Sequence, residues 1–69
     1  MIPFDVFLDK NLSDAIRKVV ISCPCDYDEA LRLLNISRNY LRDVEIIIKL
    51  KISGMKELEI SKIIQALNN

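Results

Sequence analysis

The sequence predicts an all-α fold, in which residues 1–69 form one small four-helix domain with a central helix-turn-helix. Apolar residues recur at helical spacing in four segments of the chain. Chain breakers, among them Pro24 and Gly54, separate these segments. Half of the 69 residues are apolar (51%), and ten basic residues balance ten acidic ones, which is typical of a folded chain rather than a disordered one.

The first expected helix spans residues 12–21 and ends before Pro24. Asn11 or Ser13 can cap its start, and Asp14 lies four residues before Lys18, a favourable helical pair. Before this helix we expect a short turn packed on the core. Its apolar residues are Phe4, Val6, Phe7 and Leu8.

The second helix is expected to begin at Asp26, because Asp26 and Glu29 have the spacing of a capping box. We expect it to end at Asn35, since asparagine tolerates the left-handed conformation that a tight helix exit often needs. Its apolar face is expected to contain Ala30, Leu31, Leu33 and Leu34.

The third helix is expected to start with Ser37 as its cap. Leu41 and Val44, followed by either Ile47 or Ile48, would face inward. After Ser53 and Gly54, a last helix is expected over residues 55–67. Its apolar residues are expected to be Leu58, Ile63, Ala66 and Leu67.

Residues 45–52 permit a second interpretation, because apolar and charged side chains alternate there with strand periodicity. A strand at 45–52, paired with residues 19–23, would give a winged variant of a three-helix domain. The pair Glu45 and Lys49, four residues apart, favours a continued helix instead.

Catalytic and membrane-spanning roles find no support in the composition. The chain has no His and one Gly, so the commonest acid–base residue and both Gly-rich phosphate loops are missing. No apolar run approaches the roughly 18 residues that cross a bilayer, and the N-terminus lacks the pattern of a secretory signal. We therefore expect a cytoplasmic protein that is not an enzyme, has no cofactor and has no membrane partner.

Charge is distributed unevenly along the chain. Residues 1–29 hold three basic and six acidic side chains, and residues 30–69 hold seven basic and four acidic ones. Such local asymmetry, rather than net charge, attracts charged partners.

Residues 29–45 have the form of a helix-turn-helix: a helix, a short turn, and a helix that opens Ser-Arg-Asn-Tyr. This segment resembles the DNA-reading part of the phage repressor and Cro-like family, and residues 62–68 are similar to that family's following helix. The ParB-like helix-turn-helix family has a similar Ile-Ser-Arg segment. The resemblance implies that DNA contacts come from Tyr27, Ser37, Arg38, Asn39 and Arg42.

The residues themselves are compatible with this motif. Two helices that cross steeply need small or apolar contacts, which are expected at Ala30, Leu34, Ile36, Leu41 and Val44. Four polar residues would then lie outside: Arg38, Asn39, Arg42 and Asp43. Arginine suits guanine edges or phosphates, asparagine suits adenine, and Lys49 would touch phosphate.

We therefore expect a sequence-specific protein that binds double-stranded DNA, a small transcriptional regulator. The alternative is a protein–protein adaptor of the same fold that binds a larger nucleic-acid-processing assembly, because function depends on the site rather than the fold. An ordinary helical hairpin with solvated arginines is the plainest interpretation of the same segment.

Two further features bear on partners. Helix three carries surplus apolar residues, so we expect a homodimer whose interface contains Ile46, Ile47 and Leu50. Cys23 and Cys25 are expected to be reduced and metal-free. A Cys₄ zinc site shared across a dimer is the alternative.

Overall fold

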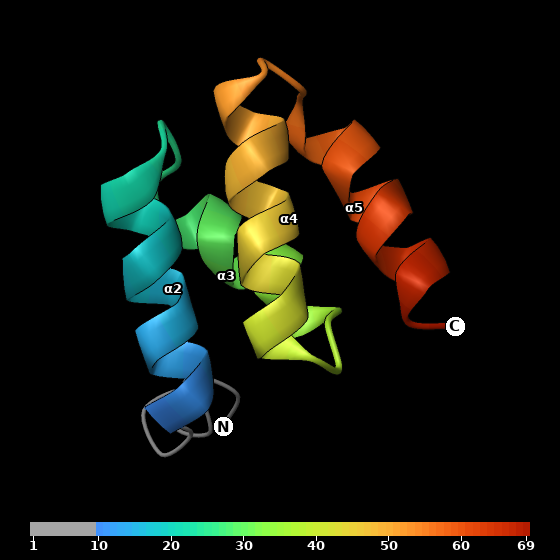
Figure 1. The fold of residues 1–69 in the computed structure, drawn as a ribbon, viewed down its shortest axis with the longest axis horizontal. Coiled ribbons are helices and arrows are strands. Elements are labelled where there is room, and N and C mark those ends of the chain that lie inside the picture. The colour runs from blue at the N-terminus through green and yellow to red at the C-terminus, as the bar shows by residue number, and fades with distance from the viewer. Residues whose placement is uncertain (1–9) are drawn as a thin grey trace.

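The computed structural model describes residues 10–69, which form four α-helices and contain no strand (Figure 1). The helices are α2 (Lys10–Ser22), α3 (Tyr27–Asn35), α4 (Tyr40–Ile52) and α5 (Glu57–Leu67). The all-α expectation is confirmed. The winged alternative is wrong, because residues 45–52 lie within α4. The turn expected around Phe4, Val6, Phe7 and Leu8 lies outside the described residues.

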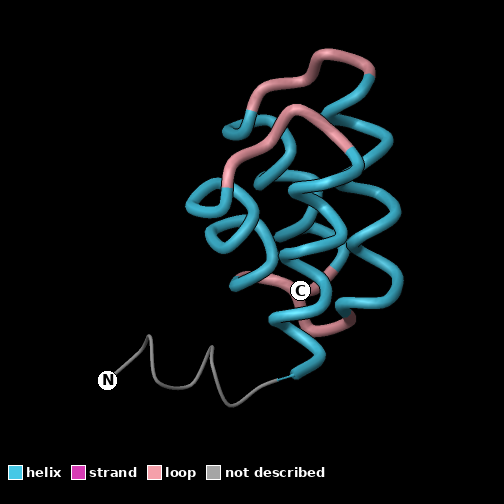
Figure 2. The backbone as a smooth tube through the Cα atoms, turned by 90° about the vertical axis from the view of Figure 1, so that its left-hand side faces the viewer, coloured by secondary structure: helices cyan, strands magenta, loops and turns pink. Residues whose placement is uncertain are grey.

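Helices α2 and α4 lie side by side and run in the same direction, and α3 crosses behind them (Figure 1). Helix α5 packs on α3 and α4 and does not contact α2. Figure 2 shows two of the connecting loops at one end of the molecule, with the third loop and the C-terminus at the other. Because the third loop is the α3–α4 turn, that turn and the C-terminus share one end of the fold.

The N-cap residue of α3 is the one expected from the sequence, whereas the N-cap of α4 is a different residue. Asp26 caps α3 as expected, and its Oδ1 accepts the Glu29 N–H at 2.8 Å. At α4 the cap is Asn39 rather than Ser37, and Asn39 Oδ1 accepts the Arg42 N–H at 3.2 Å. The expected left-handed exit at Asn35 is wrong, because no described residue other than glycine has a positive φ.

The left-handed position lies instead between α4 and α5. Gly54 has a φ of +97°, which only glycine adopts without strain. Its N–H donates to the Lys51 carbonyl at 3.0 Å, and the Met55 N–H donates to the Leu50 carbonyl at 3.0 Å. Gly54 therefore turns the chain tightly enough to return α5 along α4.

The core is built from one apolar face of each helix, together with the loop residue Cys25. Its buried side chains are Leu12, Ala15, Ile16, Val19, Cys25, Ala30, Leu33, Leu34, Val44, Ile47, Ile60 and Ile64.

Two of the four helices face differently from the expectation. In α4, Leu41 is 90% exposed although it was expected inside. In α5, Leu58, Ala66 and Leu67 are exposed, and Ile60 and Ile64 occupy the core instead. Both helices carry more apolar residues than one face can bury. Packing against the neighbouring helices therefore determines which of these residues face the core.

Three of the helix contacts also include an ion pair. Among residues 10–69 these inter-helix pairs are Lys18–Glu45 between α2 and α4, Glu29–Lys51 between α3 and α4, and Arg32–Glu57 between α3 and α5. The Glu29–Lys51 pair is the least exposed of the three, with side chains 16% and 14% exposed. Partial burial makes this pair less sensitive to salt than the two outer ones.

Candidate functional site

The turn between α3 and α4 is organised around a buried carboxylate. Asp43 is fully buried, although it was expected outside. Its Oδ1 accepts from Arg42 Nε at 2.8 Å, and its Oδ2 accepts from the Ser37 hydroxyl and from Asn68 Nδ2 at 2.9 Å. Asp43 therefore holds the turn together from within.

Asp43 stays ionised at neutral pH. Burial raises the pKa of its carboxyl. The hydrogen bonds from Arg42, Ser37 and Asn68, together with the charge of Arg42, outweigh that effect and hold the pKa below its ordinary value. A charged acceptor strengthens each of the bonds that it receives.

Asn68 brings the C-terminal end of α5 onto the same turn. Its Oδ1 accepts from the Arg38 backbone N–H at 2.8 Å and from Arg42 Nη2 at 3.2 Å. Its Nδ2 donates to Asp43 Oδ2 and to the Ile64 carbonyl. These contacts of Asn68 could not be predicted from the sequence, because Asn68 lies 25 residues from Asp43 and belongs to no local motif.

Ser37, Asn39 and Arg42, three of the residues expected to contact DNA, are engaged within this network. Ser37 is 6% exposed, so little of its side chain is accessible to a ligand. Its Oγ also accepts the Asn39 N–H at 3.1 Å. Asn39 is exposed, but its side-chain oxygen caps α4. The Arg42 side chain is 42% exposed and donates to both Asp43 and Asn68.

The other expected DNA contacts are more accessible. Arg38 and Lys49 are exposed, and within residues 10–69 neither side chain forms an ion pair. Tyr27 is 48% exposed and opens α3. It lies a helix length from the turn, about 13 Å for nine residues. The structure thus separates Tyr27 from the α3–α4 turn.

The residues expected at a dimer interface also differ in their accessibility. Ile47 is fully buried, so its assignment to an interface is wrong. Ile46 and Leu50 are partly buried and pack against the core.

The outward face of α4 is formed by other residues: Leu41, Glu45, Lys49 and Ile52. We call these four residues the α4 stripe. They follow one another at intervals of four, four and three residues, which places them on one side of a helix. Leu41 is 90% and Ile52 63% exposed, and the charged pair lies between them. The exposure of Leu41 and Ile52 could not be predicted from the sequence, because helical periodicity alone does not show which side of α4 packs against the core.

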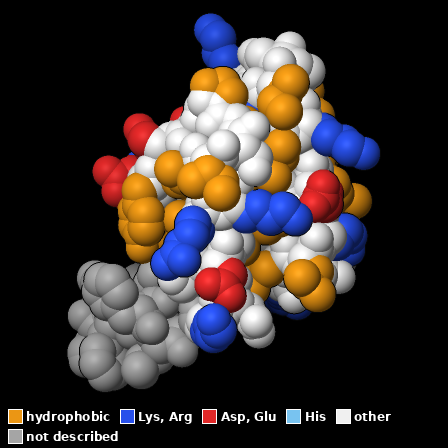
Figure 3. Space-filling model, turned by 60° about the vertical axis from the view of Figure 1, so that its left-hand side comes forward, with side chains coloured by type: hydrophobic (Ala, Val, Ile, Leu, Met, Phe, Trp, Pro, Cys, Tyr) orange, Lys and Arg blue, Asp and Glu red, His pale blue; other side chains and the backbone are white. Residues whose placement is uncertain are grey.

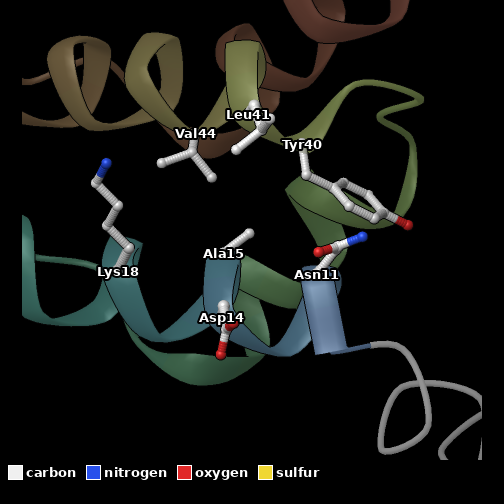
Figure 4. Close-up of a pocket in the computed structure, with 7 residues that line it drawn as sticks. All are labelled: Asn11, Asp14, Ala15, Lys18, Tyr40, Leu41 and Val44. Atoms are coloured by element: carbon white, nitrogen blue, oxygen red, sulfur yellow. The ribbon is translucent and has the colours of Figure 1, made fainter.

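A groove of about 180 Å³ runs beside the stripe, between α2 and α4 (Figure 4). Its lining residues are Asn11, Asp14, Ala15, Lys18, Tyr40, Leu41 and Val44. Ala15 and Val44 point toward each other across it, Lys18 lies at one end, and Tyr40 and Asn11 lie at the other (Figure 4). Because ligand pockets usually exceed about 300 Å³, the groove suits a side chain of a partner better than a small molecule.

Lys18 joins the groove to the stripe. Its Nζ donates to Glu45 Oε2 at 2.8 Å, and this bond lowers the pKa of Glu45. On the face where α2 comes forward, basic, acidic and apolar side chains are interspersed, and no single sign of charge covers it (Figure 3).

The two cysteines, Cys23 and Cys25, are free thiols. The thiol of Cys23 donates to the Val19 carbonyl at 3.2 Å, and that of Cys25 to the Asp26 carbonyl at 3.7 Å. Burial raises the pKa of Cys25 to about 12 and also raises the pKa of Cys23. Both are therefore neutral at pH 7, whereas metal binding and nucleophilic attack require the thiolate.

Residues 10–69 contain no group of three or more His, Cys, Asp or Glu side chains that could hold a metal ion. Over the same residues, no helix has the length and apolar character that crossing a bilayer requires.

Comparison of the chain with protein-family models, with curated proteins and with solved structures finds no match.

Proposed function

We propose that this protein is a protein-interaction module that binds its partner through the α4 stripe and the adjoining groove. The observation that carries the proposal is the exposure of Leu41. Burying one leucine side chain yields about 1.5–3 kcal/mol, yet Leu41 is 90% exposed in the first turn of α4. Single exposed apolar residues are common. Here Leu41 also borders a groove and shares its helix face with Ile52, as at an interface.

The state of the turn supports protein contact over base reading. Direct readout requires polar groups that are free to bond base edges. The Ser37 hydroxyl, the side-chain oxygen of Asn39 and two of the Arg42 nitrogens (Nε and Nη2) instead form hydrogen bonds within the fold. Glu45 also places a carboxylate on the face that would approach phosphates. A partner helix with apolar anchors and charges of both signs fits this surface better than a duplex.

A photo-crosslinking experiment tests the proposal. Benzoylphenylalanine replaces Leu41 or Ile52 in the full chain, expressed in its native cells. The matched control replaces Ile21, which is 77% exposed on α2 and lies outside both the stripe and the groove. We expect a discrete covalent adduct from positions 41 and 52 but not from position 21. Equal labelling at all three positions, or no adduct at 41 and 52, would overturn the proposal.

DNA binding is the second candidate, because Arg38 and Lys49 are exposed cations without ion pairs among the described residues. Fluorescence anisotropy with a labelled duplex at about 50 mM salt tests it, since even non-specific binders show affinity there. If DNA is the ligand, Arg38→Ala weakens binding by about 1–3 kcal/mol when it touches a base, and Leu41→Lys does not weaken it. An absence of binding rejects this candidate.

The cytoplasmic location expected from the sequence belongs to the same proposal. Free thiols such as Cys23 and Cys25 persist in a reducing compartment. Immunofluorescence or cell fractionation with the full chain tests the location directly.

A further inference from the structure

We infer that the partner is a second copy of this chain, which lies antiparallel on the first so that the two α4 stripes face each other. This inference rests on the proposed function, because it uses the same surface. It differs from the dimer expected from the sequence, which required the buried Ile47.

The order of residues along the stripe is self-complementary. In a two-fold dimer, if residue i contacts residue j of the second copy, then j contacts i of the second copy. Read from the start of α4, the stripe is apolar, acidic, basic, apolar: Leu41, Glu45, Lys49, Ile52. When the two stripes lie antiparallel about an axis near the middle of α4, Glu45 contacts Lys49 of the second copy. Leu41 meets Ile52 of the second copy at each end.

Both charged groups are available for this pairing. Lys49 has no ion pair among the described residues. Glu45 receives Lys18 on Oε2, which leaves Oε1 for Lys49 of the second copy. A parallel arrangement would instead place Glu45 opposite Glu45 and Lys49 opposite Lys49. Because like charges repel, the two ion pairs select the antiparallel arrangement.

Apolar side chains supply much of the surface that this dimer would bury. Helix α4 has 13 residues and is about 20 Å long, so its stripe alone falls short of the roughly 800 Å² that each partner buries in a stable complex. The walls of the adjoining groove extend the contact with Tyr40 from α4 and Asn11 and Asp14 from α2. Leu41 and Ile52, the most exposed apolar residues of α4, lie at the ends, where they exclude water from the central ion pairs.

A charge-swap series tests the pairing in purified protein by sedimentation equilibrium at low salt. Wild type is expected to dimerise, and Glu45→Lys and Lys49→Glu are each expected to weaken self-association about tenfold, because each converts both ion pairs into like-charge contacts. The double variant E45K/K49E is expected to dimerise again. A 1:1 mixture of the two single variants is expected to form a heterodimer of near wild-type affinity.

The mixture is the decisive arm, because rescue between two chains cannot come from a change in the fold of either chain. Glu45→Lys also loses its contact with Lys18, so circular dichroism of each single variant serves as the folding control. A monomeric wild type at millimolar concentration, or a dimer that the single swaps do not weaken, would overturn self-pairing. The crosslinking experiment separates this failure from that of the proposed function, since an adduct from position 41 with a protein other than this chain supports the function and excludes the second copy.

Discussion

Asp43→Asn tests whether the buried carboxylate holds the α3–α4 turn to the end of α5. Asparagine keeps the shape of the side chain but replaces one accepting oxygen with a donor and removes the charge. Asp43 is fully buried and accepts from Ser37, Asn68 and Arg42. The amide oxygen of asparagine can take the place of Oδ2 and accept from Ser37 and Asn68, but the amide NH₂ group then faces the Arg42 guanidinium, which loses its acceptor. The two retained hydrogen bonds also lose their charged acceptor and become weaker.

The expected loss can be set against the stability of the whole domain. A hydrogen bond to a charged group contributes about 1.5–3 kcal/mol and a bond between neutral groups about 0.5–1.5 kcal/mol, so removing the charge weakens each bond by about 1–1.5 kcal/mol. We count the Ser37 and Asn68 bonds and leave out Arg42, because its side chain is 42% exposed and screened by solvent. We therefore expect Asp43→Asn to lower the free energy of unfolding by about 2–3 kcal/mol. A domain of this size has only about 3–10 kcal/mol in total.

Urea and thermal unfolding, followed by circular dichroism at 222 nm, measure this loss. For a small domain the Tm falls by about 4–8 °C per kcal/mol, so a decrease of at least about 8 °C is expected at pH 7. The control is Glu59→Gln, which removes an acid that is exposed and without an ion pair in the described part of the chain. Its Tm should stay close to that of wild type.

The pH dependence provides a second readout. The pKa of Asp43 is held below its unfolded value, so its contribution is present above about pH 4 and is lost as the pH falls through the folded pKa. The difference in stability between wild type and Asp43→Asn should therefore narrow from about pH 4 downward. If Asp43→Asn is as stable as Glu59→Gln at pH 7, or if its difference from wild type stays constant down to pH 2, then the ionised Asp43 carboxylate does not stabilise the turn.

Three other outcomes follow from the same contacts. Glu29→Gln breaks the largely buried pair with Lys51 and is expected to lower the free energy of unfolding by about 1–2 kcal/mol in urea titrations; no change would mean that the ion pair does not stabilise the fold. Arg32→Ala breaks the more exposed pair with Glu57, so its smaller loss should disappear in about 1 M salt, and a loss that persists there would point to packing by the arginine stem. At pH 8, iodoacetamide should alkylate Cys25 at least about tenfold more slowly in the folded chain than in urea, as seen by mass spectrometry, because its pKa of about 12 leaves little thiolate; equal rates would contradict its burial.

Local sequence alone determined where the helices lie. Pro24 and Gly54 separate helices at the expected places, and the Asp26 cap forms as the spacing of Asp26 and Glu29 predicted. Residues 45–52 are helical, as the pair Glu45 and Lys49 favoured. These features depend on residues within one turn of each other, so no distant contact was needed to predict them.

How each helix is rotated about its axis depends on the packing between helices and could not be predicted from local sequence. In α4, Leu41 faces outward and Asp43 faces inward. Asp43 is held inside because it accepts a hydrogen bond from Asn68, which follows α5. In α5, Ile60 and Ile64 reach the core ahead of Leu58, because α3 and α4 pack on that side. A helix with apolar residues around most of its circumference can bury several alternative faces, and the choice among them depends on neighbours that are distant in the sequence. The α4 stripe is the face left exposed by that choice, which is why periodicity alone could not identify it.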